Sequence, residues 1–170
     1  ATDSRVQCVS AAVTIGNGRR WMEGVRTAEE TAALHDRSTK DRLSRAETGK
    51  SEYGPPPGIL YMSAREKELW AAARADSAAE PPPVPTEFID ETMVFHPEWV
   101  VDKISPRPLL LIATELDGVT PPEESRKLHE LAGDPKKLVM IPDCGHFEVY
   151  MGAPFDQTCS ETVAWFDEYL

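Results

Sequence analysis

The sequence predicts an α/β fold built on a mostly parallel sheet, and three observations support this prediction. Residues 109–113 and 137–141 are apolar runs, which are typical of strands covered on both faces. One helical pattern begins at Pro121, between these runs, and another occupies residues 155–170. Strands that alternate with helices in this order form parallel sheets.

The apolar spacing of the two helices predicts which side chains pack against the sheet. In the first helix, Leu128 and Leu131 are expected to face the core. In the last helix, Val163, Phe166 and Leu170 recur at helical spacing and predict its apolar side.

A further strand is predicted near the start of the chain, at residues 6–14, where small and β-branched residues dominate. This segment is apolar enough to need cover on both faces, yet nothing before it supplies a neighbouring strand. We therefore expect a companion polypeptide to complete the sheet. It would be the amino-terminal half of the same protein or a separate chain.

Residues 17–94 differ in composition from the segments on either side. Residues 36–50 are rich in charge and are expected to be solvated. A helix is predicted over residues 63–75, where Ser63 and Glu66 match a capping box. Most of the excess among the 15 prolines also falls in this region. We interpret the region as a mainly helical, proline-rich insertion.

The composition of the chain argues against several classes of binding partner. A formal net charge of −11 argues against nucleic acid, because an acidic chain repels phosphates. No apolar run reaches the ~18 residues of a membrane span, so no membrane partner is expected. Three cysteines do not make a disulfide framework, which makes a cytoplasmic location the default expectation. Nothing indicates a cofactor, and His35, His96 and His129 lack metal-ligand spacing.

Two polar residues follow the two apolar strands. Asp117 comes after residues 109–113, and His146 comes after residues 137–141. Ligands bind beyond the carboxyl ends of parallel strands, so the two side chains are expected to meet at that edge. A carboxylate beside an imidazole orients the ring and stabilises its cation, as in a catalytic triad. Gly145 suits a tight turn just before the histidine.

Other interpretations of these residues stay open at the level of sequence. Asp117 could cap the helix that begins near Pro121, and Glu115 is a rival for the acid role. His146 could be a core histidine. Cys144, two residues before it, could form a thiol or metal pair with it, although no metal site is expected.

These segments resemble parts of the α/β-hydrolases. Residues 109–117, followed by Pro121, are similar to the family's acid-bearing segment, and residues 141–147 are similar to its histidine loop. Ile104-Ser105-Pro106-Arg107-Pro108 resembles the dienelactone-hydrolase-like and polyketide-transferase-like branch.

The resemblance implies the carboxyl-terminal part of a mostly parallel α/β-hydrolase sheet with a helical lid. Residues 1–16 would be a core strand, residues 17–94 the lid and residues 95–170 the part of the core that carries acid and histidine. Trp21 and Phe147 are the candidate substrate-binding residues on this interpretation.

The family's nucleophile, a serine in a Gly-x-Ser-x-Gly elbow, precedes the acid along the chain. The sequence holds no such elbow, and Gly49-Lys50-Ser51-Glu52-Tyr53 lacks the closing glycine. The resemblance therefore implies ester or thioester hydrolysis, or acyl transfer, with the serine supplied by the companion polypeptide. A small acyl compound would be the substrate. Carbon–carbon bond chemistry, a non-catalytic binding protein and homo-oligomer formation remain alternatives.

Overall fold

The computed structural model describes residues 1, 3–75 and 81–170. The chain divides into two compact units. Unit 1 combines Ala1–Asn17 with His96–Leu170, and unit 2 is Gly18–Phe95. The expected insertion, residues 17–94, thus differs from unit 2 by one residue at each end.

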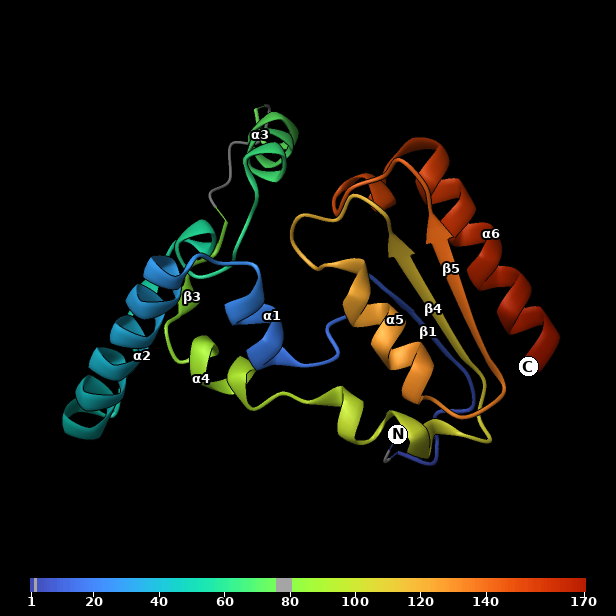
Figure 1. Cartoon of the computed structure of the whole chain (residues 1–170), viewed down its shortest axis with the longest axis horizontal. Helices are drawn as coiled ribbons and strands as arrows, with labels where there is room; N and C mark the ends of the chain where they lie inside the picture. The colour runs from blue at the N-terminus through green and yellow to red at the C-terminus, as the bar shows by residue number, and fades with distance from the viewer. Residues whose placement is uncertain (2, 76–80) are drawn as a thin grey trace. The chain divides into compact units, whose positions relative to one another are not determined.

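Unit 1 contains a parallel sheet in the order β1-β4-β5, as the sequence predicts (Figure 1). Its strands are β1 (Val9–Ala12), β4 (Leu109–Thr114) and β5 (Lys136–Ile141). Every residue of the central strand β4 is buried. The continuous apolar run of β4 follows from this position, because a central strand meets helices on both faces.

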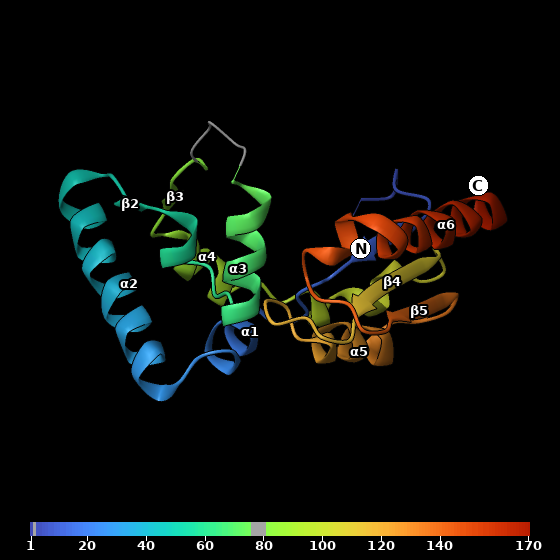
Figure 2. The same ribbon diagram turned by 90° about the horizontal axis from the view of Figure 1, so that it is seen from above.

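Helices α5 (Pro122–Leu131) and α6 (Gly152–Tyr169) lie on opposite faces of this sheet, as Figure 2 shows from above. Alternate side chains of β4 pack on opposite faces of the sheet. Leu110 and Ile112 pack in a cluster with Trp165 of α6. Leu109 and Leu111 pack with Leu128 of α5. Short 3-10 helices precede β4 and α6: η2 (Pro97–Trp99), η3 (Val101–Ile104) and η4 (Glu148–Tyr150).

Three leucine and valine positions on these helices were predicted wrongly. Leu131 is 39% exposed, Val163 56% and Leu170 73%. The side of α6 that packs on the sheet instead presents Trp165, with Phe166 and Tyr169 partly buried beside it. On α6, large aromatic side chains fill the side that meets the sheet, and Val163 is left on the exposed side.

Strand β1 is shorter than the predicted residues 6–14 and is half-buried throughout. Within the described residues it pairs with β4 alone, Val9 lying opposite Leu109. Among the described residues, no strand pairs with its other edge.

Unit 2 is mainly helical. It comprises α1 (Gly18–Gly24), α2 (Ala28–Thr48), β2 (Tyr53–Gly54), η1 (Pro56–Gly58), α3 (Ala64–Ala73), β3 (Val84–Pro85) and α4 (Phe88–Met93). Thr27 and Glu30 form a reciprocal capping box at the start of α2, and Gly49 ends it in the left-handed conformation. Ser63 caps α3 by accepting a hydrogen bond from the Glu66 N–H, as predicted.

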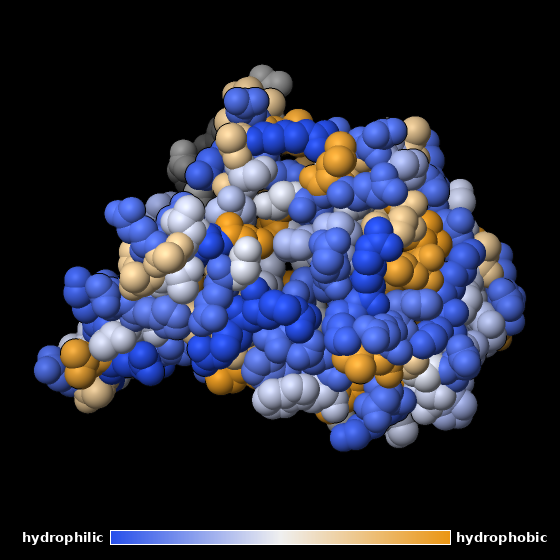
Figure 3. Space-filling model, viewed as in Figure 1, coloured by the Kyte–Doolittle hydropathy of each residue, from blue (hydrophilic) through white to orange (hydrophobic). Residues whose placement is uncertain are grey.

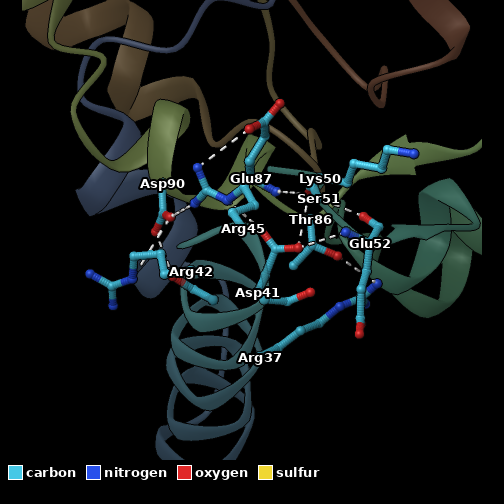
Figure 4. Close-up of polar contacts among 12 residues, drawn as sticks. Arg37, Asp41, Arg42, Arg45, Lys50, Ser51, Glu52, Thr86, Glu87 and Asp90 are labelled. Atoms are coloured by element: carbon cyan, nitrogen blue, oxygen red, sulfur yellow. Dashed lines mark hydrogen bonds and ion pairs between the residues drawn. The ribbon is translucent and has the colours of Figure 1, made fainter. Parts of the chain in front are cut away.

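The charge-rich stretch at residues 36–50 is not wholly solvated, which corrects the sequence interpretation. Asp41 is 1% exposed and accepts hydrogen bonds from Ser51 and from the Glu52 N–H (Figure 4). Arg45 forms ion pairs with three carboxylates of this region: Asp41, Glu87 and Asp90. Burial is possible here because each buried polar group has partners.

The first and last residues of unit 2 are joined directly. The Gly18 N–H donates to the Phe95 carbonyl over 2.8 Å. A Cβ atom at position 18 would lie 1.8 Å from the Thr92 carbonyl oxygen, so this close approach requires glycine.

The face of the molecule shown in Figure 3 is largely hydrophilic, with separate apolar patches. Among the described helices, none combines the length and the apolarity that crossing a bilayer requires.

Candidate active site

Two loops follow β4 and β5 at the carboxyl edge of the sheet in unit 1 (Figure 1). By their position in the chain, Asp117 lies in the first of these loops and His146 in the second. The two strands are parallel neighbours, with Thr114 opposite Ile141 at their last paired positions. Each loop leaves the sheet at this point, so the fold brings together two residues that are distant in sequence.

The two side chains are hydrogen-bonded, as the sequence predicts. His146 Nδ1 lies 2.9 Å from Asp117 Oδ2 and 3.2 Å from Oδ1. The Asp117 side chain is 1% exposed and that of His146 is 16% exposed. A buried carboxylate thus holds an imidazole that remains accessible from outside.

The Asp117 carboxylate is fixed by its own loop. Oδ1 accepts hydrogen bonds from the backbone N–H groups of Val119, at 2.8 Å, and Thr120, at 2.6 Å. The Thr114 hydroxyl donates to Oδ2 over 3.4 Å. Helix α5 begins later and has no side-chain cap, so Asp117 shapes the loop and does not cap the helix.

The histidine loop is held by contacts of its own. The residue of this loop in the left-handed conformation is Asp143, with φ 51°, two positions before Gly145. Aspartate is one of the few residues other than glycine that adopt this conformation readily. The Gly145 N–H donates to Glu148 Oε2 over 2.8 Å. The Leu116 N–H donates to the Cys144 carbonyl over 2.9 Å, which ties the acid loop to the histidine loop.

The structure distinguishes Asp117 from the other residues that the sequence offered as candidates for the site. Glu115 is exposed, whereas Asp117 is buried and bonded to the histidine. Cys144 is 1% exposed and belongs to the apolar cluster under α6. Ser51 lies in unit 2, where its hydroxyl donates to Asp41 over 2.9 Å. Among the described residues, no three His, Cys, Asp or Glu side chains gather as a metal site would need.

The two candidate substrate-binding residues differ in setting. The Phe147 ring stands edge-on to the His146 ring, with centroids 5.1 Å apart, and is half-buried. Trp21 is only 4% exposed and lies in α1 of unit 2. A substrate role for both residues stays a prediction.

Sequence reasoning missed one residue that supports the pair. Thr114 was not singled out, although it ends a buried strand. A polar residue at the end of an otherwise apolar run was the available signal, because a buried hydroxyl needs a partner.

Comparisons with known proteins identify the fold. No family model matches the chain. An Escherichia coli protein named "Uncharacterized 31.7 kDa protein in traX-finO intergenic region" is 23% identical over 171 residues, covering 100% of this chain. The crystal structure of the α/β hydrolase GrgF from Penicillium sp. sh18 matches 99% of the chain with a TM-score of 0.73 and 18% identity. The monoacylglycerol lipase of Paleococcus ferrophilus matches 98% with a TM-score of 0.65 and 15% identity. The chain has the α/β-hydrolase fold.

The chain corresponds to only part of the length of each of these proteins. It spans 59% of the Escherichia coli relative, 57% of the GrgF chain and 61% of the lipase chain.

Proposed function

We propose that Asp117 and His146 are two members of the catalytic triad of a serine hydrolase that cleaves or transfers acyl groups. The observation that carries the proposal is the 2.9 Å hydrogen bond between His146 Nδ1 and the buried Asp117 carboxylate. A carboxylate on one ring nitrogen selects the tautomer whose other nitrogen can accept a proton.

In this mechanism, His146 Nε2 removes the proton of a serine hydroxyl as the oxygen attacks an ester or thioester carbonyl. The same nitrogen then protonates the leaving group, and the cycle repeats with water. Asp117 stabilises the imidazolium at both steps. Its hydrogen bonds from Val119 and Thr120 keep the carboxylate aligned throughout.

The serine and the oxyanion hole would come from a companion polypeptide, most simply an amino-terminal segment of the same protein. Two observations support this. The chain contains no Gly-x-Ser-x-Gly elbow. Strand β1 also leaves one edge without a strand partner among the described residues. A segment that adds strands beside β1 would extend the sheet on which such an elbow is built.

Unit 2 would act as the lid, and Phe147 and Trp21 would contact the acyl substrate. The edge-on contact of Phe147 with the His146 ring supports its part, since an apolar side chain there would border the reacting bond. The mainly helical composition of unit 2 and its position as an insertion between β1 and β4 support the lid role.

A serine-reactive fluorophosphonate tests the proposal on the longest native form of the protein. Labelling requires an activated serine, so it should be strong in the wild type and lost in His146→Gln. His129→Gln, a histidine on α5, is the matched control and should label normally. Peptide mapping should place the label on a serine in a Gly-x-Ser-x-Gly sequence outside the 170 residues. Labelling that persists in His146→Gln, or its absence from the wild type, would refute the proposal and favour a non-catalytic binding protein.

A further inference from the structure

Unit 2 contains a pocket of about 340 Å³ whose lining combines cationic and apolar side chains. Helix α2 and the segment that follows η1 supply most of its walls. A volume of this order is typical of small-molecule sites, which lie between roughly 300 and 1,000 Å³. The pocket is formed by residues of unit 2 alone, whereas Asp117 and His146 belong to unit 1.

Two arginines of the pocket are anchored to adjacent carbonyl groups. Arg26 donates from Nη1 to the Met22 carbonyl and from Nη2 to the Ile59 carbonyl, at 2.5 and 2.9 Å. Arg37 donates from Nη1 to the Gly58 carbonyl over 2.7 Å. The adjacent carbonyls of Gly58 and Ile59 therefore hold both guanidinium groups in place. Each group still has N–H donors that these bonds do not use.

The pocket carries an excess of positive charge. Arg26, Arg37 and Lys67 line it, against the single carboxylate of Glu30. Glu30 also accepts a hydrogen bond from the Thr27 N–H in the capping box. Among the described residues, neither arginine has a carboxylate within ion-pair distance. This setting contrasts with the net charge of −11 of the whole chain.

A second, larger pocket of unit 2, with a volume of about 750 Å³, lacks this uncompensated positive charge. Arginines line it as well, but their charges are compensated. Arg45 is paired with three carboxylates, as Figure 4 shows, and Arg42 lies 3.8 Å from Asp90. Arg19 is paired with Glu23.

The remaining wall of the smaller pocket is apolar. Leu34 and Met62 are buried beneath it, and Leu60 and Tyr61 are half-buried at its side. The Arg26 guanidinium lies 5.6 Å from the centroid of the Tyr61 ring. Burial lowers the pKa of Arg26, so its charged form gains from a nearby anion.

We propose that this pocket binds an amphiphilic anion, with a carboxylate or phosphate head between Arg26, Arg37 and Lys67 and an apolar tail along Leu34 and Tyr61. Guanidinium groups bind both head groups through paired N–H donors. Because the arginines are already held by backbone carbonyls, little side-chain freedom is lost on binding.

Calorimetric titration of the protein with decanoate, decyl phosphate, decanol and acetate tests this assignment. Decanoate and decyl phosphate should both bind more tightly than decanol, which lacks the charge, and than acetate, which lacks the apolar tail. The stronger of the two anions identifies the head group. Decanol binding as tightly as the anions would overturn the proposal.

Variants locate the binding at this pocket. Lys67→Gln and Arg37→Gln should each weaken binding of the preferred anion about tenfold, the effect of losing one charged hydrogen bond. Lys67 is exposed and its ammonium group makes no hydrogen bond or ion pair to another described residue, while its backbone N–H bond to Ser63 does not depend on the side chain. Its replacement therefore leaves the fold intact. Lys40→Gln, an exposed lysine on the same helix α2 as Arg37, is the matched control and should bind like the wild type. Equal affinity of all three variants would refute the site. The assay needs no turnover, so its result is independent of the triad.

Discussion

The Asp117 carboxylate accepts hydrogen bonds through both oxygens, and among the described residues His146 is the partner that comes from another strand's loop. The remaining donors, Val119, Thr120 and Thr114, belong to the acid's own loop and strand. The acid is thus held by donors of its own loop and strand, and it in turn helps to orient the histidine.

This asymmetry predicts the effect of Asp117→Asn. An amide at position 117 keeps the shape of the side chain but offers His146 an N–H donor, which favours the wrong tautomer. We expect the rate of ester hydrolysis by the longest native form to fall about 10³- to 10⁴-fold, with little change in the melting temperature. Exposed Glu115→Gln is the control. An equal loss of rate in the control would remove Asp117 from the acid role.

Glu124 holds the segment that follows β1. Its Oε2 accepts hydrogen bonds from the Gly16 and Asn17 N–H groups, both over 2.9 Å, and the residue is 4% exposed. Glu124→Ala leaves these donors without their acceptor, so we expect a loss of about 2–3 kcal/mol in the free energy of unfolding. Urea denaturation measures this loss. The exposed neighbour Glu123→Ala should change stability by less than about 0.5 kcal/mol, and a similar loss in both would contradict the assignment.

Asp41 makes the stability of unit 2 depend on pH. Burial raises the pKa of Asp41, but hydrogen bonds from the Glu52 N–H, Ser51 and Arg45 outweigh burial, so the pKa lies below its ordinary value of 3.8. The stabilisation is therefore complete above that value and is lost as the pH falls through the lower, folded-state pKa.

The variant Asp41→Asn removes this dependence. We expect it to lower the free energy of unfolding by about 2 kcal/mol at neutral pH. The melting temperature of the variant should also fall less steeply than that of the wild type as the pH is lowered below about 4. Circular dichroism melts across this range give both quantities. Asp36→Asn, exposed on the same helix, should behave as the wild type. If the melting temperature of Asp41→Asn falls with pH as steeply as that of the wild type, other carboxylates control the acid sensitivity of unfolding.

Hydrogen exchange should distinguish the two units. The amides of β4 are buried and paired with strands on both sides, whereas α2 has many exposed residues along its length. We expect slower exchange over residues 108–142 than over residues 18–95. Uniform protection across both ranges, measured by mass spectrometry of peptic fragments, would indicate a single cooperative structure.

The sequence was sufficient to predict the parallel sheet and the meeting of Asp117 with His146. Both follow from local patterns, since apolar runs mark strands and parallel strands share a carboxyl edge. The environment of Asp41 could not be predicted, because a charged residue on a helix does not reveal which distant side chains will cover it. The exposure of Val163 was missed for a related reason, since spacing alone does not decide which of two apolar stripes meets the sheet.

The hydrogen bond between Gly18 and Phe95 has a consequence for how proteins of this fold diversify. A segment whose two ends lie side by side can be lengthened, shortened or exchanged, and the chain around it needs only a short turn to close the gap. Selection can therefore change residues 18–95 as one exchangeable segment while the strands and loops that position Asp117 and His146 are inherited unchanged. Sequence divergence among homologues should accordingly be concentrated between these two residues.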